Sequence, residues 1–150
     1  MSESSQIPLI ATVCFPADQQ LQVSEVGRVP LILLRRKDDI LVFLDNCPDE
    51  NLRLNPVLNS HGQIVCTHHG ARFDCAGCLV HPGTAHHPAR CDQGLQAVPV
   101  DVVGPEVVKV TLTPELQREA DRLAERRRRR GKGGRLRRLL RGLVAWLRGR

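Results

Sequence analysis

Two short segments of the chain contain the residue types that hold metal ions. The first reads Cys47-Pro48-Asp49 and the second reads Cys66-Thr67-His68-His69-Gly70, with 16 residues between Asp49 and Cys66. Thiolate, imidazole and carboxylate groups are common protein ligands of transition metals. The chain has six cysteines, and its first residues lack the charged and apolar regions of a secretory signal. We therefore expect a cytoplasmic location, where clustered Cys and His indicate metal or redox chemistry rather than structural disulfides.

The two segments and their surroundings resemble the cluster-binding loops of Rieske proteins. An apolar strand precedes Cys47-Pro48, and the second segment continues as Ala71-Arg72-Phe73-Asp74, then Gly77 and the Val98-Pro99-Val100 strand. The resemblance covers residues 7–112 and is closest to stand-alone, ferredoxin-type members. It implies an all-β fold of three stacked antiparallel sheets, with a small subdomain that carries the cluster near the surface.

The resemblance also implies a 2Fe-2S cluster held by Cys47, Asp49, Cys66 and His69. In a Rieske centre two thiolates hold one iron and two imidazoles hold the other, which raises the reduction potential. This sequence departs from the family at Asp49, where the family has His. A carboxylate ligand is harder than imidazole and adds a negative charge, so we expect it to lower the potential. His68 or His61 could replace it as the fourth ligand after a loop rearrangement.

The implied function is one-electron transfer with a reductase or an oxygenase as partner, without a substrate of the chain's own. A degenerate Rieske fold that holds no cluster and serves as an interaction module is the alternative. A structural zinc site belongs with that alternative, because Cys66-x-x-His69 is followed by Cys75-x-x-Cys78 at a suitable spacing. Against zinc, the strand that leaves the second loop should carry Cys75 and Cys78 away from it.

The remaining cysteines and histidines give weaker signals. Cys14 lies in an apolar strand and is expected to be a small core residue. Cys78 and Cys91 could form a regulatory disulfide across the intervening loop. The other three histidines are expected to be solvated loop residues: His81, His86 and His87.

Short β-branched and aliphatic runs, punctuated by Pro, Gly and Asp, predict an antiparallel β domain up to residue 112. Hairpin turns are expected at Asp38–Asp39 and Gly104–Pro105. The expected strands are Ile7–Phe15, Val29–Arg35, Ile40–Leu44, Gln63–Cys66, Ala71–Cys75, Gln96–Val102 and Val107–Leu112.

A change of charge separates this part from a tail of residues 113–150. Residues 1–113 carry 8 Lys/Arg and 12 Asp/Glu, whereas residues 114–150 carry 14 Lys/Arg and 4 Asp/Glu. Thr113-Pro114-Glu115 is typical of a helix start, with Thr as the cap. A thin apolar stripe follows, then the solvated run Arg126–Arg130 and a break at Gly131–Gly134. A second, Arg-rich amphipathic helix is expected over Arg135–Arg148.

The tail has three candidate partners. Its second helix has an aliphatic stripe opposite its arginines, so residues 135–148 could lie on an anionic membrane surface. Packing on the β domain itself or on an acidic redox partner is equally favoured. Nucleic acid is less favoured, because no aromatic residues are interleaved for base stacking.

Overall fold

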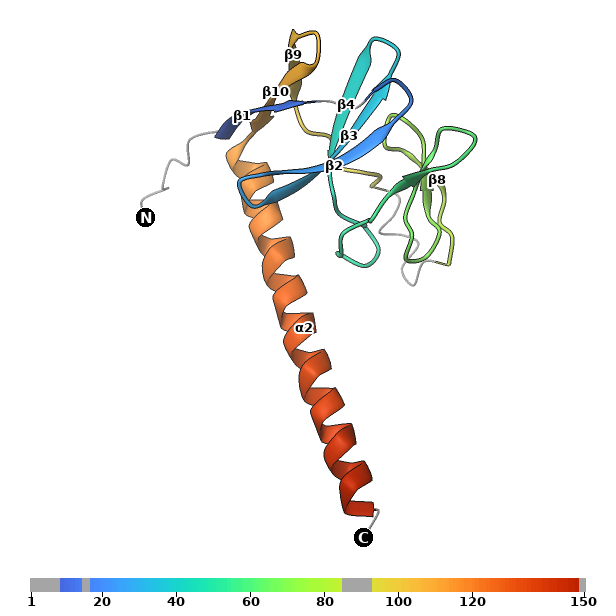
Figure 1. Ribbon diagram of the computed structural model, residues 1–150, viewed down its shortest axis with the longest axis vertical. Coiled ribbons are helices and arrows are strands. Elements are labelled where there is room, and N and C mark those ends of the chain that lie inside the picture. The colour runs from blue at the N-terminus through green and yellow to red at the C-terminus, as the bar shows by residue number, and fades with distance from the viewer. Residues whose placement is uncertain (1–8, 15–16, 85–92, 149–150) are drawn as a thin grey trace.

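The computed structural model describes residues 9–14, 17–84 and 93–148, with side chains as far as residue 131. Within these residues, ten strands are followed by one long helix that extends well beyond the strands (Figure 1). The elements are β1 (Leu9–Cys14), β2 (Leu21–Val26), β3 (Val29–Arg36), β4 (Asp39–Leu44), β5 (Val57–Leu58), β6 (Ile64–Val65), β7 (Arg72–Phe73), β8 (Leu79–His81), β9 (Val100–Gly104), β10 (Val107–Leu112) and α2 (Pro114–Arg148).

The strands form three antiparallel sheets, as the resemblance implied. Their orders are β1-β10-β9, β2-β3-β4 and β5-β6-β7-β8. The sheet β2-β3-β4 is the central layer, because both faces of β3 are buried. Side chains alternate between the faces of a strand, and Leu31 and Leu33 join one core whereas Ile32 and Leu34 join another. The apolar run of β3 therefore reflects burial on two sides rather than one.

Each of the two cores has its own role. The first contains Val108, Val110 and Leu112 of β10 together with Leu116 and Ala120 of α2, and it joins the helix to the sheets. The second contains the candidate ligands Cys47 and Cys66 among aliphatic and aromatic side chains. The candidate metal residues consequently belong to a packed core and not to an isolated surface loop.

Three predicted strands have nearly the expected bounds, namely β3, β4 and β10, and the hairpin turn before β10 is confirmed. The turn before β4 lies at residues 37–38, where Lys37 has φ of 55°. Strands β2, β5 and β8 were not predicted. In β2 apolar residues alternate with polar ones, so it lacks the continuous apolar run of β3, and β5 and β8 have at most three residues each. The prediction for Cys14 is wrong, because its side chain lies on the exposed face of β1.

The helix α2 begins as predicted. Pro114 is its first residue, and the Thr113 hydroxyl accepts a hydrogen bond from the backbone N–H of Leu116 at 3.4 Å. The predicted break at residues 131–134 is wrong, since the helix continues to Arg148. Each glycine costs about 1 kcal/mol relative to alanine, but the neighbouring Arg and Leu favour helix and no proline intervenes. Continuing a formed helix also avoids a second nucleation step.

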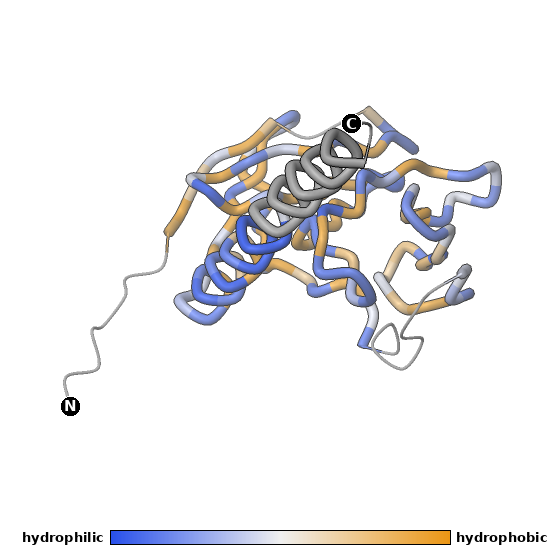
Figure 2. Tube along the Cα trace, turned by 90° about the horizontal axis from the view of Figure 1, so that it is seen from below, coloured by the Kyte–Doolittle hydropathy of each residue, from blue (hydrophilic) through white to orange (hydrophobic). Residues whose placement is uncertain are grey.

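The beginning of α2 packs on the β domain, whereas the alternatives predicted for the tail concern residues 135–148, whose side chains the structure does not describe. Leu116, Ala120 and Leu123 are buried, while the described turns of the helix are otherwise largely hydrophilic (Figure 2). The prediction that the run Arg126–Arg130 is solvated is confirmed for most of the run, which is exposed, but Arg127 and Arg130 contact the β domain. In the part of the chain that the structure describes, no helix has the length and apolar character to cross a membrane.

Candidate metal centre

The first candidate loop leaves β4 and turns tightly around Cys47. The backbone N–H of Cys47 donates to the carbonyl of Leu52, and the N–H of Asn51 donates to the carbonyl of Cys47, both at 2.8 Å. Asn51 has φ of 52°, in the left-handed region that Asn tolerates better than most residues. These bonds direct the Cys47 side chain into the core, where it is fully buried.

The second candidate loop is a compact turn between β6 and β7. The N–H of Cys66 donates to the carbonyl of Ala71, and the N–H of Gly70 donates to the carbonyl of Cys66, both at 2.9 Å. The carbonyl of His69 accepts hydrogen bonds from the backbone N–H of Thr84 at 2.8 Å and from its hydroxyl at 3.1 Å. Thr84 thus supports His69 from outside the loop.

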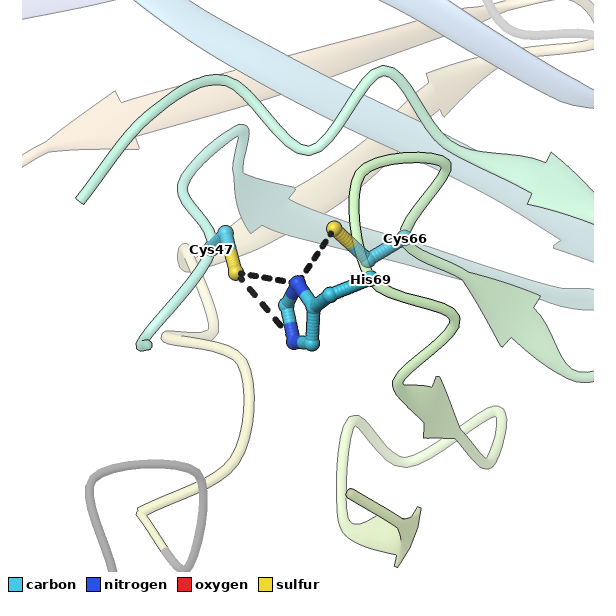
Figure 3. A group of neighbouring side chains, drawn as sticks. All are labelled: Cys47, Cys66 and His69. Carbon is cyan, nitrogen blue, oxygen red and sulfur yellow. Dashed lines mark hydrogen bonds between the residues drawn. The ribbon is translucent and has the colours of Figure 1, made fainter. Parts of the chain in front are cut away.

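The two loops bring Cys47, Cys66 and His69 together, with their ligand atoms within 4.8 Å of one another (Figure 3). Nδ1 of His69 lies 3.4 Å from Sγ of Cys66 and 3.7 Å from Sγ of Cys47. All three side chains are buried. Three of the four residues predicted as ligands therefore form one group.

The fourth predicted ligand, Asp49, is buried with only 1% of its surface exposed, but it is not part of that group. Neither alternative histidine belongs to the group. Nε2 of His68 lies 2.9 Å from the carbonyl oxygen of Arg53, and Nδ1 of His61 lies 3.5 Å from the hydroxyl of Ser60. Both histidines are exposed.

Cys75 and Cys78 also lie outside the group, so the predicted zinc site with Cys66 and His69 is not assembled. The strand β7 separates the two pairs, as expected from the sequence. His81 is exposed, as predicted, and its Nδ1 accepts a hydrogen bond from the N–H of Gly83. The predictions for Cys91, His86 and His87 concern residues outside the described part of the chain.

The two buried thiols share a hydrogen bond that separates their acidities. The Cys47 thiol donates to the Cys66 sulfur, which lowers the pKa of Cys66 to about 6. The same hydrogen bond, together with burial, raises the pKa of Cys47 above its usual range. A metal bound through both sulfurs would require both thiols to lose their protons.

Three of the four predicted ligands have the chemical type that a Rieske centre requires at their positions. Two buried sulfurs and an imidazole converge from two loops, and the fourth position holds a buried carboxylate. In such a centre the thiolates and the imidazoles bind different irons. The His69 ring contacts the sulfurs of both Cys47 and Cys66.

Comparison with known proteins identifies the family of this fold. The Rieske [2Fe-2S] domain family matches residues 6–99. The chain therefore belongs to the Rieske [2Fe-2S] domain family. No curated protein matches the sequence.

Among solved structures, dicamba monooxygenase bound to dicamba is 25% identical over 72% of this chain, with a TM-score of 0.54 and 33% of its own length covered. The ferredoxin of carbazole 1,9a-dioxygenase from Nocardioides aromaticivorans IC177 is 18% identical over 68% of this chain, with a TM-score of 0.51 and 98% of its own length covered. The terminal oxygenase of that dioxygenase is 19% identical over 69% of this chain, with a TM-score of 0.53 and 30% covered. This chain spans about a third or less of the oxygenase chains that it matches.

Sequence reasoning missed the residues that support the ligands from a distance. Thr84 braces His69, and Arg127 and Arg130 contact the first loop. These contacts join residues that lie 15 to 82 positions apart in the chain. Such partners have no local motif, and only the folded chain reveals them.

Proposed function

We propose that this chain is a one-electron carrier that holds a 2Fe-2S cluster through Cys47, Cys66 and His69, with Asp49 as the fourth ligand. When bound, the cluster accepts and releases single electrons at a potential set by its ligands and their surroundings. Cys47 and Cys66 would supply the thiolates for one iron, and His69 with Asp49 would supply the ligands for the other.

The observation that carries this proposal is the convergence of two buried thiols and one imidazole from two loops of a Rieske-family fold. Burial of the ligands excludes water, and the pKa of the Cys66 thiol is lowered from its usual range, which favours the thiolate form that binds metals. The fold resembles that of a complete, separate ferredoxin, 98% of whose length is covered. This supports a carrier that acts by docking rather than an enzyme with its own substrate.

The proposed partner is a reductase or an oxygenase. A solved structure of carbazole 1,9a-dioxygenase contains its oxygenase in complex with its ferredoxin, which supports a partner of the oxygenase class. We also propose that the chain acts in the cytoplasm and that residues 135–148 can bring it to an anionic membrane surface. Vesicle sedimentation with anionic and neutral lipids tests that part separately.

The test is anaerobic expression of the whole chain, followed by iron and sulfide analysis and EPR of the dithionite-reduced protein. We expect close to two irons and two sulfides per chain and a signal of low average g value. Protein that is purified under these conditions without iron and sulfide, and that takes up neither on reconstitution, would refute the proposal.

A second candidate is a site for a single metal ion in a fold that carries no electrons. Metal–sulfur bonds of about 2.3 Å and metal–nitrogen bonds of about 2.0 Å place tetrahedral ligands roughly 3.5 Å apart. The sulfur–nitrogen separations of 3.4 and 3.7 Å agree with that value. One tightly bound zinc per chain, with no sulfide, would favour this candidate and an interaction role for the basic tail.

A further inference from the structure

The helix α2 is anchored to the β domain so that one of its sides faces the first metal loop. Leu116, Ala120 and Leu123 fix the helix by entering the core. Arg127 follows Leu123 by about one turn and Arg130 follows it by about two turns, and residues three apart lie on the same side of a helix. Both side chains reach the loop that contains Cys47.

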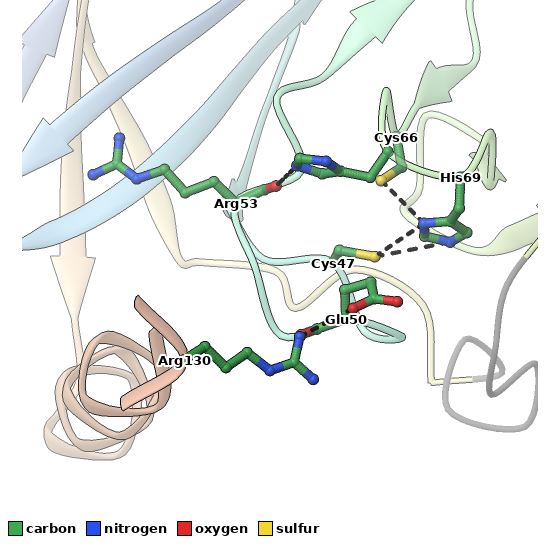
Figure 4. A network of polar contacts seen from close by, with 7 residues as sticks. Cys47, Glu50, Arg53, Cys66, His69 and Arg130 are labelled. Carbon is green, nitrogen blue, oxygen red and sulfur yellow. Dashed lines mark hydrogen bonds and ion pairs between the residues drawn. The ribbon is translucent and has the colours of Figure 1, made fainter. Parts of the chain in front are cut away.

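The two arginines contact the loop on either side of Cys47. Nη2 of Arg127 donates to the carbonyl oxygen of Asp45 at 3.1 Å and to Oδ1 of Asn46 at 3.4 Å. Nη1 of Arg130 donates to the carbonyl and to the carboxylate of Glu50, both at 3.0 Å (Figure 4). Hydrogen bonds from charged groups are about twice as strong as neutral ones.

Asp45 extends this contact to the second metal loop. Its side chain is 1% exposed, and its Oδ1 accepts a hydrogen bond from the N–H of Leu54 at 2.8 Å. The carbonyl of Leu54 accepts a weaker bond from the N–H of Thr67 at 3.3 Å, and Thr67 is next to Cys66. These hydrogen bonds thus connect the helix to Asn46, which precedes Cys47, and to Thr67, which follows Cys66.

Two buried atoms in this set need a further partner. Oδ2 of Asp45, an acceptor, and Nε of Arg127, a donor, are buried and have no hydrogen-bond partner among the protein atoms. Both residues line a small cavity of about 10 Å³, which is close to the smallest volume that can hold one water. An unsatisfied buried polar atom costs about 1–3 kcal/mol. A single water that bridges the two atoms in this cavity would remove that cost.

We propose that Arg127 is a positioning residue for the metal centre, which acts with Asp45 and one bridging water to hold the loop that presents Cys47. Arg130 holds the other side of the same loop through Glu50. The docking of α2 is thereby coupled to the geometry of the metal ligands. This inference rests on the proposed metal site but not on which metal the site holds.

The test is amide hydrogen exchange of the full-length, metal-free protein, followed by NMR or by mass spectrometry of short peptides. We compare the wild type with Arg127→Gln and Arg130→Gln, and use Arg128→Gln as the matched control. Arg128 belongs to the same run of arginines but is exposed, and it lies away from the loop. Arg130 is half exposed, so its variant carries the test if Arg127→Gln does not fold.

We expect the amides of Cys47, Asn51 and Leu54 to exchange about tenfold faster or more in Arg127→Gln, and to be unchanged in Arg128→Gln. The amides of Val108 and Val110 in β10 should keep their wild-type rates. Unchanged exchange in the loop, or equal acceleration in β10 from general destabilisation, would overturn the inference.

A second measurement uses protein loaded with whichever metal it binds. We expect a chelator to remove the metal about tenfold faster from Arg127→Gln than from wild type, with Arg128→Gln like wild type. Equal removal rates in all three proteins would count against a positioning role. If the wild type holds no iron-sulfur cluster but the exchange result is as expected, the electron-carrier proposal fails and the positioning role of Arg127 stands.

Discussion

Nδ1 of His69 lies 3.4 Å from Sγ of Cys66 and 3.7 Å from Sγ of Cys47, so one imidazole contacts both buried thiols. The three side chains therefore pack directly against one another, with the imidazole in contact with both sulfurs. The buried Asp49 stands beside this arrangement and is not part of it. In the proposed cluster, Asp49 would join His69 as a ligand of the second iron.

Replacing Asp49 by histidine is the first test of that point. The variant Asp49→His supplies the second imidazole, so we expect its potential to exceed the wild-type value by roughly 100 mV or more. The reduced variant should also give the EPR spectrum of a centre with two histidines. Redox titration monitored by EPR measures both.

The control for this variant is Asp49→Asn, which keeps the size of the side chain and removes its charge. It should lose iron, because an amide is a poor ligand of the second iron. If neither the wild type nor Asp49→His binds iron, the cluster hypothesis is wrong for this chain. Retention of wild-type iron and potential by Asp49→Asn would show that Asp49 is not a ligand.

Removing either buried thiol should remove the metal. We expect Cys47→Ser and Cys66→Ser each to lose at least nine-tenths of the bound metal, because a hydroxyl binds soft metal centres far less strongly than a thiolate. Metal analysis of purified protein provides the measurement. Cys78→Ser, at an exposed cysteine outside the group, should keep its full content.

Much of the fold could be predicted from local patterns. The continuous apolar run of β3 and the Thr113-Pro114 start of α2 are strong signals, and the structure confirms both. The break at residues 131–134 was wrong because three glycines lower helix propensity without forcing a turn. A Cβ on Gly131 would meet no atom within 4 Å, so nothing there requires glycine.

The candidate site was predictable in its residues but not in its geometry. Cys47, Cys66 and His69 follow from the two motifs, and the structure brings them together. The contact between His69 and both sulfurs depends on side-chain rotamers that no spacing determines. Arg127 was also beyond sequence reasoning, because an arginine within a charged run is usually solvated, and its partner Asp45 lies 82 residues away.

The packing of α2 predicts that replacing Leu123 strongly destabilises the protein, because its side chain is buried against the β domain. Leu123→Ala leaves a cavity, so we expect it to lower the free energy of unfolding by about 2–4 kcal/mol. The neighbouring Arg122→Ala is the control, since its side chain is 67% exposed and its ion pair with Glu119 is worth under about 1 kcal/mol. Urea denaturation followed by circular dichroism compares them. Equal midpoints for Leu123→Ala and wild type would mean that α2 does not dock in solution.

The contacts that support the second metal loop predict that any side chain at position 83 destabilises this loop. Gly83 has φ of 63°, and a Cβ there would lie 2.6 Å from the backbone nitrogen of Ala71 and would clash with the carbonyl of His69. Strained backbone of this kind costs about 1–3 kcal/mol. We therefore expect Gly83→Ala to lower the free energy of unfolding by that amount and to weaken metal binding, as measured by urea denaturation and chelator competition.

Gly131→Ala is the opposite case and serves as the comparison for Gly83→Ala. It adds the same methyl group in open space within a helix, where alanine is favoured over glycine by about 1 kcal/mol. We expect Gly131→Ala to raise helicity by circular dichroism and to leave metal binding unchanged. If Gly83→Ala bound metal as tightly as Gly131→Ala, the loop around His69 would be more adaptable than its contacts with Gly83 and Thr84 indicate.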